Sequence, residues 1–217
     1  MDYEAKPFIC DKARHMLGYV DRVSQPLPAT PWQEVPDLYS RLDKEHPSYL
    51  ALRFTIVTAA RGMLVHGARF SEIDGDVWTV PQERMKGERG KVQDFRIPLS
   101  NEALNVVEQC KSTARNDFLF PSPRAAGGVS DVAMSMVLKH LNEAGRVHGF
   151  RTSFRTWVQE TEAAGFEVGE TALAHIVSNK VERAYARSEL LDKRRILMQK
   201  WADYVTQTEA KVVQLRG

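Results

Sequence analysis

The sequence predicts a mainly α-helical (α+β) domain with one small antiparallel β-sheet. Apolar residues recur at helical spacing through much of the chain, most clearly over residues 48–60. The pattern changes at two short β-prone runs, residues 77–80 and 95–98, which flank a polar, glycine-containing segment and therefore indicate a hairpin. The chain has 217 residues, of which 43% are hydrophobic and 27% charged, a composition typical of a globular protein with a substantial core.

The beginning of the chain divides into a leading segment and a linker. Residues 24–31 contain three prolines, and each proline disfavours the helical conformation of the residue before it. We therefore expect an N-terminal segment with a proline-rich linker over residues 1–30 and a second unit over residues 31–217. The first helix of that unit can begin near Thr30, which has capping-box spacing to a glutamine, or at Pro36, in which case it runs to residue 45.

Serine caps mark the helices that follow the hairpin. Ser100 and Ser130 each precede an apolar-periodic segment, as N-cap serines do. The expected helices cover residues 100–115, 130–144, 150–164, 171–176, 181–187 and 189–215. In the last of these, several residues fit helical spacing for one buried stripe: Leu190, Ile196, Leu197, Trp201 and Tyr204.

Composition excludes several function classes. The 30 basic and 28 acidic residues leave a formal net charge of +2, so overall charge does not by itself indicate a nucleic-acid-binding protein. The two cysteines, Cys10 and Cys110, lack the spacing of a zinc site or a disulfide framework. No apolar run has the length of a membrane span, and the first residues lack the apolar segment of a signal peptide. We expect a soluble protein of the cytoplasm.

Three features in the last third of the chain carry chemistry. His148 and Arg151 are three residues apart where a helix begins, which turns both toward one side. His175 interrupts an apolar run, and Tyr185 lies among basic residues. Taken singly, each has an ordinary structural explanation: a surface pair, a hydrogen-bonded core histidine and a half-buried helix tyrosine.

Taken together with Arg61, these residues resemble the tyrosine recombinase (phage integrase) family, and in particular the integrases of genomic islands and prophages. Residues 58–61 and 67–74 look like the first arginine box of the family. His148 to Arg151 matches its H-x-x-R box, residues 172–175 match its third box, and Tyr185 follows ten residues later, where the nucleophile is expected. The resemblance covers roughly residues 31–205 and implies the helical catalytic domain of these enzymes.

The resemblance implies a role for each residue. Tyr185 would attack a DNA phosphodiester and form a 3′-phosphotyrosyl intermediate, and His148 would accept the phenolic proton. Arg61 and Arg151 would hold the non-bridging phosphate oxygens and stabilise the charge of the transition state. His175 would donate a hydrogen bond to the phosphate.

Two lysines compete for the remaining role, the donation of a proton to the leaving 5′-hydroxyl. Lys86 matches the family pattern better than Lys91, and both lie in the predicted hairpin turn. The resemblance implies no metal and no other cofactor, because the arginines supply the positive charge and the phosphotyrosyl bond keeps the energy of the broken one.

One departure from the family pattern is Leu64, which occupies a position where an acidic residue usually helps to orient the site. Either a neighbour such as Glu72 compensates, or activity is reduced. Two alternatives to a recombinase therefore stay open: a recombinase-like DNA-binding module with impaired cleavage, and DNA relaxation of the type IB topoisomerase kind, which shares the cleavage chemistry.

The expected partner is double-stranded DNA. Basic side chains gather in the hairpin region and around the tyrosine, where phosphate contacts would give salt-dependent affinity: Arg84, Lys86, Arg89, Lys91, Arg96, Lys180, Arg183, Arg187, Lys193, Arg194 and Arg195. The resemblance also implies a homo-tetramer on DNA, a monomer when free, a C-terminal helix that docks on a neighbouring protomer, and upstream DNA-binding domains that this sequence lacks.

Overall fold

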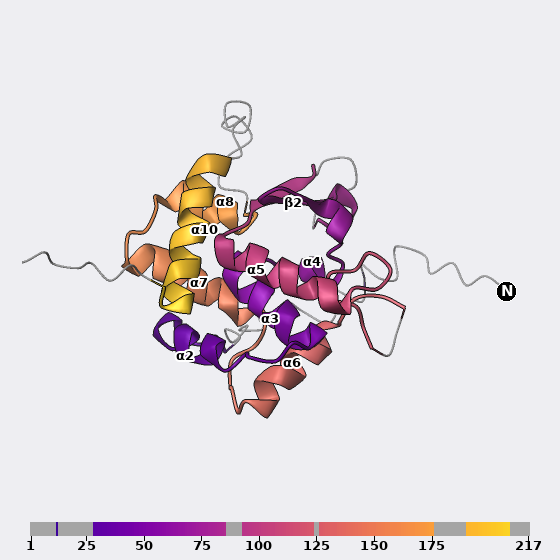
Figure 1. Cartoon of the computed structure of the whole chain (residues 1–217). Coiled ribbons are helices and arrows are strands. Elements are labelled where there is room, and N and C mark those ends of the chain that lie inside the picture. Colours follow the sequence, from indigo (N-terminus) through magenta and orange to yellow (C-terminus); the bar gives the residue numbers. More distant parts are fainter. Residues whose placement is uncertain (1–11, 13–27, 86–92, 124–125, 176–189, 209–217) are drawn as a thin grey trace, which may run out of the picture.

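The computed structural model of the chain describes residues 12, 28–85, 93–123, 126–175 and 190–208, and it consists mainly of helices with one small sheet at its edge (Figure 1). The elements in chain order are η1 (Trp32–Glu34), α2 (Val35–Ser40), α3 (Pro47–Thr58), α4 (Gly62–His66), η2 (Phe70–Glu72), β1 (Ile73–Asp74), β2 (Val77–Val80), η3 (Gln82–Arg84), β3 (Phe95–Pro98), α5 (Asn101–Cys110), η4 (Lys111–Thr113), α6 (Asp131–His140), α7 (Gly149–Glu160), α8 (Phe166–Ala172) and α10 (Leu191–Thr206). The mainly α fold with one small antiparallel sheet is therefore confirmed.

Helix α3 forms the centre of the core. All of its residues are buried except Arg53, and α4, α5, α6, α7 and α10 pack against it. A helix that is apolar around its whole circumference is expected in such a position, because every face meets a neighbour. Figure 1 shows α3 enclosed by these elements. The structure thus confirms the helix expected at residues 48–60, with bounds that differ by one or two residues.

The sheet has three strands in the order β1-β2-β3, with both pairs antiparallel. The two expected strands, β2 and β3, pair with Trp78 opposite Ile97, and the short β1 is an additional edge strand. Trp78 and Val80 are buried on the core face, and Val77 and Thr79 between them are only partly buried. This alternation of burial is typical of a strand that packs one face on the core, and it confirms the strand predicted from the β-prone run.

Two helical expectations were wrong in their placement. The helix expected at residues 171–176 lies earlier, as α8, and ends at Ala172; Ala174 then has a left-handed backbone, with φ of 50°. The helix expected from Pro36 to residue 45 ends at Ser40, and Pro36 lies in its first turn, where a proline removes no helical hydrogen bond. The helix expected at residues 181–187 lies outside the described residues.

The stripe expected on the C-terminal helix is only partly correct. Trp201 and Leu197 are buried, but Ile196 is 61% exposed and Arg194 takes its place in the interior. Nη2 of Arg194 donates to the carbonyl of Arg96 at 2.6 Å, and its guanidinium lies over the Phe95 ring. Helix α10 packs on α2, α3, α5, α8 and β3 of its own chain. Trp201 and Leu197 therefore pack within their own domain in the single chain, and docking of the C-terminal helix on a neighbouring protomer stays a prediction.

The residues just before η1 pack on the start of α7. The backbone N–H of Arg146 donates to the carbonyl of Pro28 at 3.1 Å, and the Ser153 hydroxyl donates to the carbonyl of Thr30. A Cβ at Gly149 would approach this carbonyl of Pro28 to 2.8 Å, so the contact requires glycine. These contacts hold the beginning of α7, which carries part of the site. No described helix is long and apolar enough to cross a membrane.

Candidate active site

Arg151 is the most constrained of the candidate residues. Its side chain extends from the first turn of α7 and is only 6% exposed. Nη1 donates to the carbonyl of Ala59 at 2.8 Å, and Nη2 donates to the carbonyl of Leu173 at 2.6 Å. Ala59 ends α3 in a left-handed conformation, with φ of 49°. The guanidinium therefore bridges the ends of α3 and α8, and neutral carbonyls hold it.

Arg61 lies beside this group. It precedes α4 at the N-cap position, and its Nη2 makes a long contact of 3.5 Å with the carbonyl of Ala174. Burial and the charge of Arg61 lower the pKa of Arg151 to about 10, although the nearby Glu170 carboxylate opposes this shift. Burial also lowers the pKa of Arg61. Two neighbouring cations, both with a lowered pKa, define a place that favours an anion.

His175 lies in the turn after α8 and closes the same cluster. Its Nε2 is 3.1 Å from Nη2 of Arg151, and its Nδ1 is 2.9 Å from Oε2 of Glu170. The other oxygen of this carboxylate, Oε1, accepts from Nε of Arg155 at 2.7 Å. The sequence analysis did not predict Glu170 as a site residue. The one feature that could have indicated it is its position five residues before His175.

His148 lies at the N-cap of α7, three residues before Arg151. Partial burial and the positive charges of Arg151 and Arg61 lower its pKa, while the Asp131 carboxylate partly opposes the shift and His175 adds to it. Asp131 begins α6, and a Cβ at Gly62 would collide with its carboxylate. A histidine with a lowered pKa is neutral near pH 7 and can accept a proton.

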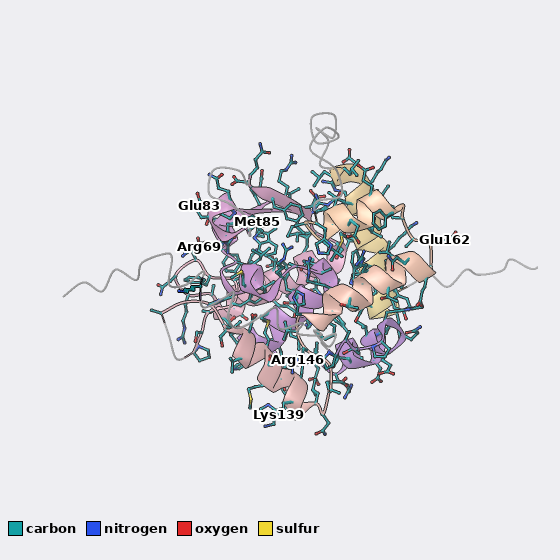
Figure 2. The ribbon with its side chains drawn as sticks, turned by 180° about the vertical axis from the view of Figure 1, so that it is seen from behind. Arg69, Glu83, Met85, Lys139, Arg146 and Glu162 are labelled. Atoms are coloured by element: carbon teal, nitrogen blue, oxygen red, sulfur yellow. The ribbon has the colours of Figure 1, made fainter. Side chains whose placement is uncertain are left out.

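The structure thus brings four of the six predicted site residues together: Arg61, His148, Arg151 and His175. The other two, Lys86 and Tyr185, lie outside the described residues, as does Lys91. Figure 2 shows Glu83 and Met85 beside the sheet, and Met85 is the last described residue before Lys86. Lys139, on α6, lies at the opposite end of the molecule from Glu83 and Met85 (Figure 2).

The acidic neighbour proposed for Arg61 does not serve that residue. Oε2 of Glu72 accepts from Nη2 of Arg84 and from Nε1 of Trp78, the latter at 3.0 Å. Leu64, at the position that is acidic in the family pattern, is 2% exposed and belongs to the apolar core. The hypothesis that Glu72 compensates for Leu64 at Arg61 is therefore wrong, because its carboxylate is bound to other groups.

Several basic residues expected to contact DNA have structural partners instead. Arg84 is paired with Glu72, and Arg194 is buried. Arg195 donates to both oxygens of Asp76, at 2.6 and 3.1 Å. The sequence did not indicate these partners, which tie the three side chains to the sheet and to neighbouring loops. Arg96 on β3 remains exposed.

Comparisons with known proteins show what the whole chain is similar to. No protein-family model matches the chain. Prophage integrase IntA of Escherichia coli (strain K12) is 36% identical over 156 residues, which are 69% of this chain and 37% of that protein. The integrase of Enterobacteria phage P4 is 29% identical over 208 residues, which are 87% of this chain and 47% of that protein. The chain therefore spans less than half the length of these relatives.

Solved structures define the class of fold. The lambda integrase catalytic core matches with a TM-score of 0.52 and 15% identity, over 70% of this chain and 94% of that one. XerA recombinase matches with a TM-score of 0.53 and 14% identity, over 86% of this chain and 65% of that one. The fold is that of a tyrosine recombinase catalytic domain. Together with the integrase relatives, this shows that the chain belongs to the tyrosine recombinase (phage integrase) family.

Proposed function

We propose that the chain is the catalytic domain of a site-specific DNA recombinase that cleaves and rejoins double-stranded DNA for integration or excision. One observation carries the proposal. The guanidinium of Arg151 is buried, yet carbonyl oxygens rather than a carboxylate hold it, and Arg61 and His175 converge on it. Its positive charge thus stays available for a phosphate of the DNA backbone, the ligand that a planar guanidinium binds with two hydrogen bonds.

The proposed reaction uses the residues in an in-line displacement. The Tyr185 oxygen attacks the phosphorus, the bond from phosphorus to the 5′-oxygen breaks, and a 3′-phosphotyrosyl bond forms. His148 accepts the phenolic proton, and Lys86 gives a proton to the departing 5′-oxygen. Arg61 and Arg151 stabilise the added negative charge on the non-bridging oxygens. Attack by another 5′-hydroxyl reverses these steps and joins a new strand.

The relatives support the choice of substrate and assembly. Their names describe integrases of phages and prophages, and one similar structure is a lambda integrase dimer bound to a core site, with a TM-score of 0.52 at 15% identity. We propose that this domain acts on DNA in the cytoplasm of a bacterial cell, is monomeric when free and forms a homo-tetramer on DNA.

A recombinase-like module that binds DNA with impaired cleavage is the second candidate, and Leu64 favours it. Its buried apolar side chain offers no carboxylate to the site. The two functions differ in one product, since only the recombinase becomes covalently attached to DNA. Capture of that product therefore decides between them.

The test uses the 217-residue chain and a pool of nicked duplexes with a randomised core. In such substrates the cleaved fragment diffuses away and the covalent complex accumulates. We expect DNA that stays attached to the protein in SDS, with a nucleotide adduct that mass spectrometry locates on Tyr185. Tyr185→Phe should abolish the product and leave DNA affinity nearly unchanged, whereas the matched control Tyr204→Phe should retain it. DNA binding without any adduct would support the binding module instead.

A further inference from the structure

A buried carboxylate with no assigned role joins the site to the middle of α7. Glu170 is 8% exposed, and both of its oxygens are engaged. Oε2 is 2.9 Å from Nδ1 of His175, and Oε1 is 2.7 Å from Nε of Arg155. Nε2 of His175 is in turn 3.1 Å from Nη2 of Arg151. A continuous series of polar contacts thus runs from Arg155 to the arginine proposed to hold the phosphate.

These contacts select one tautomer of the His175 ring. A guanidinium can only donate hydrogen bonds, so Nε2 must accept from Arg151. An ionised carboxylate can only accept, so Nδ1 must carry the proton that Glu170 binds. Both conditions hold for the neutral Nδ1–H form, an assignment that comes from the network of partners. The backbone N–H of His175 also donates to the Glu170 carbonyl, at 3.0 Å.

We propose that Glu170 is the positioning residue of the site: it fixes the orientation and the tautomer of the His175 ring, so that Nε2 faces Arg151 and the scissile phosphate. Nε2 can then donate to a phosphate oxygen only after the ring takes up a second proton. The catalytic part of this role rests on the proposed function, whereas the tautomer does not.

Arg155 makes the role of Glu170 testable by a conservative change. Two donors, Nε–H of Arg155 and Nδ1–H of His175, require two acceptor oxygens. In Glu170→Gln only one oxygen remains, and the charged Arg155 is the stronger partner for it. The amide NH2 then faces Nδ1 and favours the Nε2–H tautomer, whose proton points at the donor Nη2 of Arg151. The contact between His175 and Arg151 is therefore lost.

The first measurement is two-bond 1H–15N NMR of the imidazole nitrogens in the free 217-residue chain. Wild type should show His175 as the Nδ1–H tautomer, and Glu170→Gln should shift it toward Nε2–H. Glu167→Gln is the matched control, because Glu167 is an exposed carboxylate on the same helix. In the double variant Arg155→Ala/Glu170→Gln the amide oxygen is released for Nδ1–H, so the wild-type tautomer should return.

The second measurement is the rate of covalent capture with the nicked duplexes. Glu170→Gln should lower it about 10- to 100-fold, the double variant should recover part of the loss, and Glu167→Gln should keep the wild-type rate. An unchanged His175 tautomer in Glu170→Gln would overturn the proposal, even if the rate fell. A changed tautomer with the wild-type rate would overturn the catalytic part. If wild type captures no DNA while the tautomers behave as expected, the proposed function fails and the positioning of His175 stands.

Discussion

Trp201 offers the sharpest test of whether α10 belongs to the core of its own domain. Its side chain is fully buried and its Nε1 donates to the carbonyl of Ile56, at the end of α3, at 2.8 Å. Its ring also meets those of Phe154, Trp157 and Tyr204, with centroids 5.6, 5.0 and 5.8 Å away. Trp201→Ala removes this packing and the indole donor of the Ile56 carbonyl, which then accepts only the longer bond of 3.4 Å from the N–H of Ala59 among the described residues.

The expected loss follows from these contacts. Truncation of a buried aromatic residue to alanine costs about 3–5 kcal/mol, a large fraction of the ~5–15 kcal/mol that stabilises a typical domain. Trp201→Phe keeps most of the ring but not the hydrogen bond, and should cost about 1–3 kcal/mol. The control Ile196→Ala lies on the same helix but is 61% exposed, so its cost should be about 0.5 kcal/mol or less.

Equilibrium unfolding in urea, followed by circular dichroism, measures these differences. With a slope of about 2 kcal/mol per molar urea, Trp201→Ala should lower the midpoint by about 2 M, and Ile196→Ala should barely move it. Equal and small effects of the two substitutions would refute the reasoning, because they would mean that α10 separates from the domain at little cost. Such a result would favour docking of the helix on a neighbour.

Three further predictions concern the site. Arg151→Lys keeps the charge but cannot hold two carbonyls and a phosphate together, so covalent capture should fall about 100-fold or more; a near-normal rate would contradict the proposed clamp. Asp131→Asn removes the charge that opposes the lowered pKa of His148, so this pKa should fall further. Because His148 must be neutral to accept the proton, the acid limb of the pH–rate profile should move to lower pH. An unchanged or raised pKa of His148 in an NMR titration would count against His148 as the base. Lys86→Ala should slow cleavage of ordinary DNA but not of DNA with a 5′-bridging phosphorothiolate, whose leaving group needs no proton; rescue of Lys91→Ala instead would assign the role to Lys91.

The fold was predictable where a local pattern and the tertiary packing agree. Residues 48–60 are mostly apolar and contain most of the central helix, and the β-prone run at residues 77–80 became a half-buried strand. Helix α8 was misplaced because the residues it buries include a glycine and Glu170, while its Phe166 is 60% exposed. A hydrophobicity pattern cannot identify a helix whose buried face is partly polar and whose exposed face carries an aromatic ring.

The same limit applies to the charged residues. The pattern of boxes correctly grouped Arg61, His148, Arg151 and His175, because their order along the chain is informative by itself. It could not indicate that Arg194 is buried under β3. The conformation of a long side chain depends on which carbonyls and rings lie within its reach, and these come from segments nearly a hundred residues away in the sequence.

The partners of the arginines separate structural from functional charge in this chain. Arg53, Arg84 and Arg195 each pair with a carboxylate, from Glu102, Glu72 and Asp76 respectively. A carboxylate both positions a guanidinium and cancels its charge, which suits a residue that stabilises the fold. Arg151 is positioned equally firmly, but by backbone carbonyls whose dipoles leave the net charge in place. Burial and the charge of Arg61 lower the pKa of Arg151, and the charge of a bound phosphate would oppose this shift. In the proposed reaction, a guanidinium held in this way is the kind of group that can stabilise the negative charge of a transition state.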